Sequence, residues 1–165
     1  MTIKEKLCKP FAEDEHEWRV QRMGWKNDEP WVMVLCYVQA RKVQERLDEV
    51  FGVFGWKTHY KEFGGGLICR LWVNNPNIIG YEWTYKEDGA PITEVEPFKG
   101  GLSKAFVRVA SSGYGIGRYL YDLDTTFAHC STTKEKGWNK GYDKTKKKNY
   151  YWQTPKLPDW IVKGE

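Results

Sequence analysis

Few residues of this chain have the types and the spacing that catalysis needs. The sequence contains neither G-x-x-x-x-G-K-[ST], the loop that cradles the phosphates of ATP, nor G-x-S-x-G, the turn that exposes a nucleophilic serine. Gly113, Gly115 and Gly117 are spaced as G-x-G-x-G, but they follow a predicted helix rather than a strand, which is not the context of a dinucleotide-binding loop. These glycines more simply let the backbone bend or approach another group closely. We therefore expect a protein that is not an enzyme and needs no cofactor.

A metal site is the second kind of chemistry to consider. The acidic run Glu13-Asp14-Glu15 could hold a metal ion as a nuclease does, but no partner carboxylate follows on a rigid element nearby, so a solvated loop is the better interpretation. The cysteines are not paired as C-x-x-C, and the three histidines are not at ligand spacing. We expect free, buried thiols in a reducing compartment and no metal. The cysteines are Cys8, Cys36, Cys69 and Cys130.

Basic residues in a predicted helix offer the clearest binding chemistry. Lys104 and Arg108 are four residues apart and share one face of the helix over residues 97–112, and Lys99 lies near its start. Gly100-Gly101 would leave backbone N–H groups accessible there, and a helix N-terminus with nearby cations is a site where phosphate groups can bind. The pattern is equally consistent with a solvated helix face.

Two further groups of cations lie among aromatic residues. Arg19 and Arg22 belong to an aromatic-rich segment near the N-terminus, where either could touch DNA or face solvent. Residues 131–152 carry a net charge of +5, which leaves the rest of the chain at −1 within a total of +4. Such a stretch suits single-stranded nucleic acid, because cations follow the backbone and rings stack on bases; a flexible solubilising tail is the alternative. The stretch contains Lys134, Lys136, Lys140, Lys144, Lys146, Lys147 and Lys148, with Trp138, Tyr142, Tyr150, Tyr151 and Trp152.

The composition is typical of a soluble globular domain. The 165 residues are 41% hydrophobic and 16% aromatic, and the pI of about 8.8 marks a mild basic excess. A chain of this length can bury a real core. No secretory segment opens the chain, and no apolar run approaches the roughly 20 residues that span a bilayer. We expect a soluble cytoplasmic protein.

Periodicity places these residues on specific elements. Residues 16–23 and 31–38 are predicted strands, joined by a turn over residues 24–30, and together they indicate a hairpin. Residues 39–51 change to helical spacing, with Arg46 on the polar face. Three strands follow, over residues 56–63, 67–74 and 79–86, with turns at 64–66, 75–77 and 87–89, and then the helix over residues 97–112.

This order of elements predicts an α+β fold with a mostly antiparallel sheet. Residues 1–15 form a short, charged segment, and we expect them to be only partly tied down. We divide the chain into a core domain over residues 1–130 and a basic, aromatic-rich segment over residues 131–165 that packs on the core or extends it.

Several motifs resemble one known family. The most specific is Tyr114-Gly115-Ile116-Gly117-Arg118-Tyr119-Leu120-Tyr121, which follows Lys99-Gly100-Gly101 and the spaced residues Phe106, Arg108 and Ala110. Residues 37–43, followed by residues 47–52 and Gly55-Trp56, fit the pattern Y-[IV]-x-x-R-x-V … L … FG … W. Together they resemble the Rad-fifty-two-type single-strand annealing proteins, which include phage Sak-like and bacterial DdrA-like proteins. Pro10-Phe11 and Trp18-Arg19 match the family's start and Leu157-Pro158-Asp159-Trp160 its end, so the resemblance covers about residues 9–161.

The resemblance implies a β-hairpin–helix unit followed by a three-stranded antiparallel sheet and a long helix, the Rad-fifty-two-like annealase fold. It implies protomers that assemble into rings or helical filaments, with single-stranded DNA held by its phosphates along an outer basic groove. On this sequence the groove would consist of Arg19, Arg22, Lys99, Lys104 and Arg108, with Tyr37 near it.

Two features depart from the family pattern. The family usually has two adjacent basic residues in the long helix, whereas here Val107 precedes Arg108. The stretch over residues 110–114 is one residue longer than usual, so we expect the helix to end early or to bulge at Gly113. Both departures weaken the inner DNA contact, for which the Lys-rich stretch would compensate.

We therefore expect a protein that binds single-stranded DNA and anneals complementary strands without ATP, in homologous recombination and double-strand-break repair, in a bacterial or phage-infected cell. Its expected partners are single-stranded DNA and further copies of itself, then a nuclease or a single-strand-binding protein, and no membrane. Three alternatives stay open: a DNA-end protector that does not anneal, a scaffold subunit that has lost DNA binding, and a metal nuclease.

Overall fold

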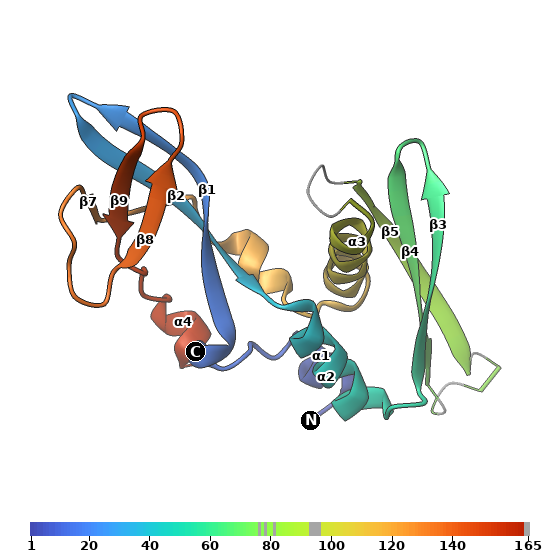
Figure 1. Cartoon of the computed structure of the whole chain (residues 1–165). Helices are drawn as coiled ribbons and strands as arrows, with labels where there is room; N and C mark the ends of the chain where they lie inside the picture. Colours follow the sequence, from blue (N-terminus) through green and yellow to red (C-terminus); the bar gives the residue numbers. More distant parts are fainter. Residues whose placement is uncertain (76, 78, 81, 93–96, 164–165) are drawn as a thin grey trace. The chain divides into compact units, whose positions relative to one another are not determined.

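Figure 1 shows the computed structural model of the chain. It describes residues 1–75, 77, 79–80, 82–92 and 97–163; Pro76 of the predicted turn and Tyr81 of the predicted strand lie outside these residues. The chain divides into two compact units, unit 1 with Met1–Phe11 and Val38–Tyr119, and unit 2 with Ala12–Tyr37 and Leu120–Glu165. Helices occur together with antiparallel sheets, which confirms the predicted α+β class. The predicted boundary at residue 130 stays a prediction.

A three-stranded antiparallel sheet is the framework of unit 1. It consists of β3 (Trp56–Phe63), β4 (Gly66–Asn74) and β5 (Trp83–Pro91), in that order. The central strand β4 alternates between buried and half-buried residues along its whole length. Since residues two apart on a strand share a face, the alternation gives the sheet one apolar face. The buried side chains of β4 are Leu67, Cys69, Leu71 and Val73.

The third strand of this sheet differs from the prediction. β5 continues to Pro91 through Glu87-Asp88-Gly89, the segment that the sequence assigns to a turn. Asp88 pairs with Cys69 in the middle of β4. The predicted turn is wrong because pairing along a buried central strand outweighs the local turn preference of Asp-Gly.

α3 (Pro97–Tyr114) lies along the apolar face of this sheet (Figure 1). The rings of Phe106 on α3 and Trp56 on β3 have their centroids 5.9 Å apart. At Gly101 the helix comes so close to β4 that an added Cβ would lie 2.8 Å from Cδ1 of Leu67. The predicted helix is confirmed, and its buried stripe contains Ala105, Phe106, Val109 and Ala110.

The C-terminus of α3 is closed by a glycine cap. Gly115 has φ +83°, in the left-handed region, and its N–H donates to the carbonyl of Ser111 (2.9 Å). The helix runs on through Gly113, so the expected early end or bulge there is wrong. A Cβ at Gly113 would lie 3.0 Å from side-chain carbons of Lys86, and the Lys86 ammonium donates to the Gly113 carbonyl (2.7 Å). The absent side chain therefore lets Lys86 lie against the helix.

α2 (Ala40–Phe51) confirms the predicted helix but corrects one of its residues. Arg46, placed by the periodicity on the polar face, is buried. Its guanidinium donates to the main-chain carbonyls of Lys6 (3.0 Å) and Lys9 (2.6 Å). A buried cation is tolerated when polar groups satisfy it, and here carbonyls from another segment do so.

The N-terminal segment is correspondingly well anchored. α1 (Ile3–Cys8) begins at a capping box in which the Thr2 hydroxyl accepts from the Glu5 N–H and the Glu5 carboxylate from the Thr2 N–H. Leu7 and Phe11 are buried, and the Arg46 guanidinium lies 4.5 Å from the centre of the Phe11 ring. The expectation of a loosely held N-terminus is wrong.

Unit 2 is built on the hairpin of β1 (His16–Lys26) and β2 (Glu29–Val38). Its turn is only Asn27-Asp28, and both residues have positive φ (51° and 61°), as a type I′ turn requires. The predicted turn over residues 24–30 is too long, because both strands continue to this tight turn. β6 (Thr126–Ala128) pairs antiparallel with β2.

The C-terminal stretch forms a second sheet in unit 2. Its strand order is β7 (Cys130–Ser131), β9 (Lys148–Trp152) and β8 (Asn139–Asp143). Tyr150 and Trp152 are buried in a core with the β2 residues Val32 and Val34. The alternative of a flexible tail is therefore wrong for β8 and β9, since these rings anchor the stretch.

Three further short helices complete the set of elements in the described residues: η1 (Glu13–Glu15), η2 (Arg118–Asp122) and α4 (Asp159–Val162). The acidic run thus forms a helical turn rather than the solvated loop that the sequence indicates, although Glu13 and Asp14 are exposed. No helix among the described residues is long and apolar enough to cross a membrane.

Candidate nucleic-acid interface

The basic residues predicted on α3 are presented to solvent. Lys99, Lys104 and Arg108 are all exposed, and the apolar stripe of the same helix is turned toward the sheet. Lys104 and Arg108 lie one turn apart, which places two cations along one side of the helix. This is a geometry that can contact successive phosphate groups of an extended strand.

Arg108 is not an isolated cation. Its Nε lies 3.4 Å from Oδ1 of Asp88 on β5, and the guanidinium side chain remains 52% exposed. The Asp88 carboxylate also accepts from the Gly89 N–H (2.7 Å) and the Ser112 hydroxyl (2.9 Å). Burial raises the pKa of Asp88, but the bonds from Gly89, Ser112 and Arg108 outweigh it and lower that pKa overall. A phosphate at Arg108 would therefore compete with a carboxylate that is charged at neutral pH.

Of the two glycines before Lys104, Gly101 does not have the predicted role. α3 begins at Pro97, so Gly101 is already in its second turn, and it is buried. The expected exposure of its backbone N–H is wrong, because the close approach to Leu67 is what needs a glycine there. Phosphate binding by the helix would depend on its side chains rather than on this backbone.

Unit 2 presents the other predicted cations on its hairpin. Arg19 and Arg22 on β1 are exposed. The Arg19 guanidinium lies 5.3 Å from the centre of the Tyr37 ring, and the Tyr37 hydroxyl donates to the Glu17 carboxylate (2.5 Å). The bond to Glu17, together with burial, raises the pKa of Tyr37. Tyr37 is half-buried, and its ring lies against the exposed Arg19 side chain.

The lysines near the β8–β9 turn gather around a tryptophan that the sequence places in a turn. Lys146 and Lys148 have their ammonium groups 5.5 and 5.7 Å from the Trp25 ring centre. The Trp25 indole N–H donates to Asp143 (2.6 Å), and this bond holds the pKa of Asp143 below its usual value. Trp25 could have been recognised from the alternation along β1. The residues that pack on the core are at even positions first (Trp18 and Val20) and then at odd positions (Met23 and Trp25).

The glycine-rich run of the family signature has a structural role. Arg118 donates from Nε to the Ser111 carbonyl (3.0 Å) and from a terminal nitrogen to the Ser112 carbonyl (2.9 Å). The Tyr119 hydroxyl accepts the N–H of Phe11 (3.1 Å). The run therefore satisfies carbonyls at the C-terminus of α3 and fixes the N-terminal segment.

The predicted site residues fall into two groups. Lys99, Lys104 and Arg108 belong to α3 of unit 1, where only Lys104 and Arg108 share one side of the helix. Arg19, Arg22 and Tyr37 belong to the hairpin of unit 2, where Arg19 contacts the Tyr37 ring. Sequence reasoning did not identify Asp88, the acceptor for Arg108, since its Asp-Gly pair resembles a turn.

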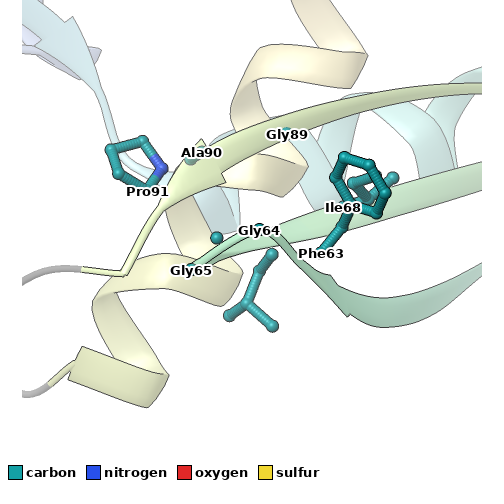
Figure 2. A pocket seen from close by; sticks show the side chains of 9 residues that line it. Phe63, Gly64, Gly65, Ile68, Gly89, Ala90 and Pro91 are labelled. Atoms are coloured by element: carbon teal, nitrogen blue, oxygen red, sulfur yellow. The ribbon is translucent and has the colours of Figure 1, made fainter.

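A pocket in the described part of the chain lacks side chains that could do acid–base or metal chemistry. A pocket of about 330 Å³ at the end of the β3–β4 hairpin (Figure 2) is lined by glycines and apolar residues without a titratable side chain. Within the described residues, no three His, Cys, Asp or Glu side chains lie close enough to hold a metal ion. The pocket is lined by Phe63, Gly64, Gly65, Gly66, Leu67, Ile68, Gly89, Ala90 and Pro91.

The cysteines are free, as predicted, but not all are buried. Cys69 is buried and Cys36 half-buried, and burial raises the pKa of each thiol to about 11. Such thiols are poor nucleophiles at neutral pH. Cys8 is exposed at the end of α1, where only Leu7 faces the core, so the expectation of burial is wrong for this cysteine.

Comparison with known proteins agrees with the resemblance seen in the sequence. The model of the Rad52/22 family double-strand break repair protein matches residues 1–139. The single-stranded DNA-binding protein DdrA of Deinococcus radiodurans is 28% identical over 127 residues, which cover 76% of this chain. The chain spans 58% of the length of that relative. The predicted family is confirmed: the chain belongs to the Rad52/22 family of double-strand break repair proteins.

Proposed function

We propose that this chain binds single-stranded DNA and anneals complementary strands in recombination and double-strand break repair, without ATP. The observation that carries the proposal is membership of the Rad52/22 family over residues 1–139. The name of the relative DdrA as a single-stranded DNA-binding protein supports the choice of ligand. The exposed cations of α3 and β1 supply the chemistry that phosphates need.

The proposed site consists of phosphate contacts rather than reacting groups. Lys104 and Arg108 on α3 hold the DNA backbone, with Lys99 nearby on the same helix. Arg19 and Arg22 on β1 provide further contacts, with Arg19 held by the Tyr37 ring. The hairpin, α2, the β3–β4–β5 sheet and α3 form the annealing fold of the family, residues 1–130 its core, and residues 131–165 an extension that adds lysines.

The physical account of annealing involves no bond chemistry. Free strands repel each other and fold on themselves. Cations that neutralise phosphates release counterions and keep a strand extended, with its bases available for pairing. Stacking in the product duplex then drives the reaction. Because counterions are released, the affinity should fall steeply as salt rises.

The decisive experiment compares binding and annealing on the same protein. Complementary fluorescent oligonucleotides report annealing, and an electrophoretic shift reports single-strand binding. Lys104→Ala combined with Arg108→Ala should weaken both, binding by roughly tenfold, because two phosphate contacts are lost. The matched control is Lys4→Ala with Lys6→Ala, two exposed lysines of α1. Equal annealing by the α3 double variant and the wild type would sink the site assignment.

A DNA-end protector that binds single strands without annealing them is the second candidate. The pairing of Arg108 with Asp88 favours it, because this pairing and the apolar Val107 leave α3 with a weaker cationic row than the family usually has. Binding without annealing would select this function. If the chain does not bind single strands at about 100 mM salt, the proposal is overturned and the role of a scaffold subunit remains.

We also propose that copies of the chain self-associate into a ring or filament. Supporting this, the outward side of the β2–β6 pair carries exposed apolar residues, among them Trp31, Leu35 and Phe127. Patches of this kind on a soluble chain usually mark protein contacts. Light scattering should give a mass of several protomers, and Phe127→Asp should lower it.

A further inference from the structure

The face of the β3–β4–β5 sheet opposite α3 carries a cluster of aromatic rings. Trp72 on β4 is paired in register with Tyr85 on β5, and the two ring centroids lie 4.4 Å apart at an interplanar angle of 47°. Trp83, two residues before Tyr85, shares its face. Trp83 is 38% exposed and Tyr85 45% exposed. We call these three rings the sheet-face cluster.

Cations lie directly over the sheet-face cluster. The Lys57 ammonium is 4.4 Å from the Trp83 ring centre and 5.6 Å from that of Trp72. The Arg70 guanidinium is 4.2 Å from the ring centre of Tyr85. Lys57 pairs in register with Trp72, and Arg70 with Glu87, to which it is also bridged at 3.1 Å. One acidic side chain therefore accompanies these two cations, and Lys61 adds a third positive charge to the same face by alternation along β3.

These contacts are not explained by packing within the unit. The apolar core lies on the other face, between β4 and α3, where Leu67, Leu71 and Val73 are buried. Even-numbered β4 residues on the cluster's side, such as Arg70 and Trp72, are only half-buried. A structural role would not require rings to remain open to solvent with cations beside them.

We propose that the sheet-face cluster is a second surface for single-stranded nucleic acid, on which bases stack on Trp72, Trp83 and Tyr85 while Lys57, Lys61 and Arg70 contact phosphates. Sheets that present aromatic rings recognise unpaired bases in this way, and base–ring stacking tolerates any sequence. Duplex DNA does not fit, because its bases are already stacked. This inference rests on the proposed function and deepens it: α3 and the sheet face would give one chain two separate surfaces, enough to hold both strands of an annealing pair.

The test separates base stacking from phosphate contact. The probes are a labelled thymidine oligonucleotide and an abasic oligonucleotide of equal length. Trp83→Ala with Tyr85→Ala should bind the thymidine strand about tenfold less tightly and the abasic strand as the wild type does, because only stacking is lost. Lys104→Ala with Arg108→Ala should weaken both probes. Phe54→Ala, which removes a ring that is 94% exposed outside the cluster, is the matched control and should change neither.

The failures are distinguishable. If the wild type binds neither probe, the proposed function and this inference are both wrong. If the wild type binds thymidine strands and the Trp83/Tyr85 variant binds them equally well, only the inference about the sheet face is wrong. A change in assembly mass with unchanged affinity would instead make the face a contact between copies and overturn the inference.

A measurement on the wild type tests the inference even if the Trp83/Tyr85 variant fails to fold. An oligonucleotide containing 5-iodouracil, crosslinked by ultraviolet light, should attach to the peptide that contains Trp83 and Tyr85. Crosslinks confined to peptides from α3 and β1 would overturn the inference.

Discussion

At the residue scale, Arg46 shows how one buried cation can hold a segment that the sequence leaves loose. Its guanidinium donates to carbonyls of Lys6 and Lys9 and lies over the Phe11 ring. Arg46→Ala should lower the free energy of unfolding by about 2–3 kcal/mol, since buried carbonyls lose their donors. For a chain of this size, thermal unfolding should shift by roughly 5–10 °C.

Arg41 provides the control for that measurement. It lies on the same helix but is exposed, so Arg41→Ala should stay close to the wild type. Equal melting temperatures for Arg46→Ala and Arg41→Ala would show that the carbonyl contacts do not stabilise the N-terminal segment.

Asp88 limits what Arg108 can do for a DNA strand. Asp88→Asn removes the carboxylate charge beside Arg108 while keeping a side chain of similar size. We expect single-strand affinity to rise by about two- to fivefold, the equivalent of one partly exposed ion pair. Fluorescence anisotropy measures the change. An affinity that falls, or one that rises equally when Arg108→Ala is already present, would show that Asp88 does not restrain Arg108.

The Asp88 carboxylate should also change how the stability of the fold depends on pH in acid. The folded-state pKa of Asp88 is lowered below its ordinary value of 3.8. A group with a depressed folded pKa contributes stability above its unfolded pKa, and this is lost as pH falls through the folded value. Melting temperatures from about pH 6 to about pH 2 should therefore fall less steeply below pH 4 for Asp88→Asn than for the wild type. Parallel curves would contradict the assignment.

At the element scale, Gly115 of the family signature caps the C-terminus of α3. Gly115 has φ +83°, and a Cβ there would lie 2.6 Å from Sγ of Cys8. Gly115→Ala should cost about 2–4 kcal/mol, of which about 1–2 comes from the left-handed backbone and the rest from crowding against α1. Gly64→Ala, with φ +54° but nothing within 4 Å, isolates the backbone part. Chemical denaturation should show a larger loss in the free energy of unfolding for Gly115→Ala than for Gly64→Ala. Equal losses would show that crowding against α1 does not contribute.

Long periodic elements were predictable from the sequence, and positions decided by distant contacts were not. The helices over residues 40–51 and 97–112 and the alternation of β4 follow from spacing alone, whereas the continuation of α3 through Gly113 does not. The Glu87-Asp88-Gly89 segment joins a strand because β4 offers it a partner, a contact that local turn preferences cannot register. Arg46 was misplaced for the same reason, since its acceptors lie about 40 residues away in sequence.

The candidate site was predictable as a set of residue types and not as a geometry. Exposed cations on α3 follow from helical spacing. The acceptor for Arg108, the ring beneath Arg19 and the cluster of Trp72, Trp83 and Tyr85 depend on strand register. A one-residue change of register moves every side chain to the other face, and sequence alone does not fix it.

At the scale of the whole molecule, the salt dependence of binding reports how many cations the DNA contacts in each unit. For single strands, the slope of log affinity against log salt is about −0.7 per neutralised phosphate. Lys104→Ala with Arg108→Ala in unit 1, and Arg19→Ala with Arg22→Ala in unit 2, should each reduce the slope by about 1.4. Lys4→Ala with Lys6→Ala should leave it unchanged. If one strand contacts both units, combining the two pairs should reduce the slope by about 2.8, whereas a unit without DNA contact would contribute nothing when its pair is removed.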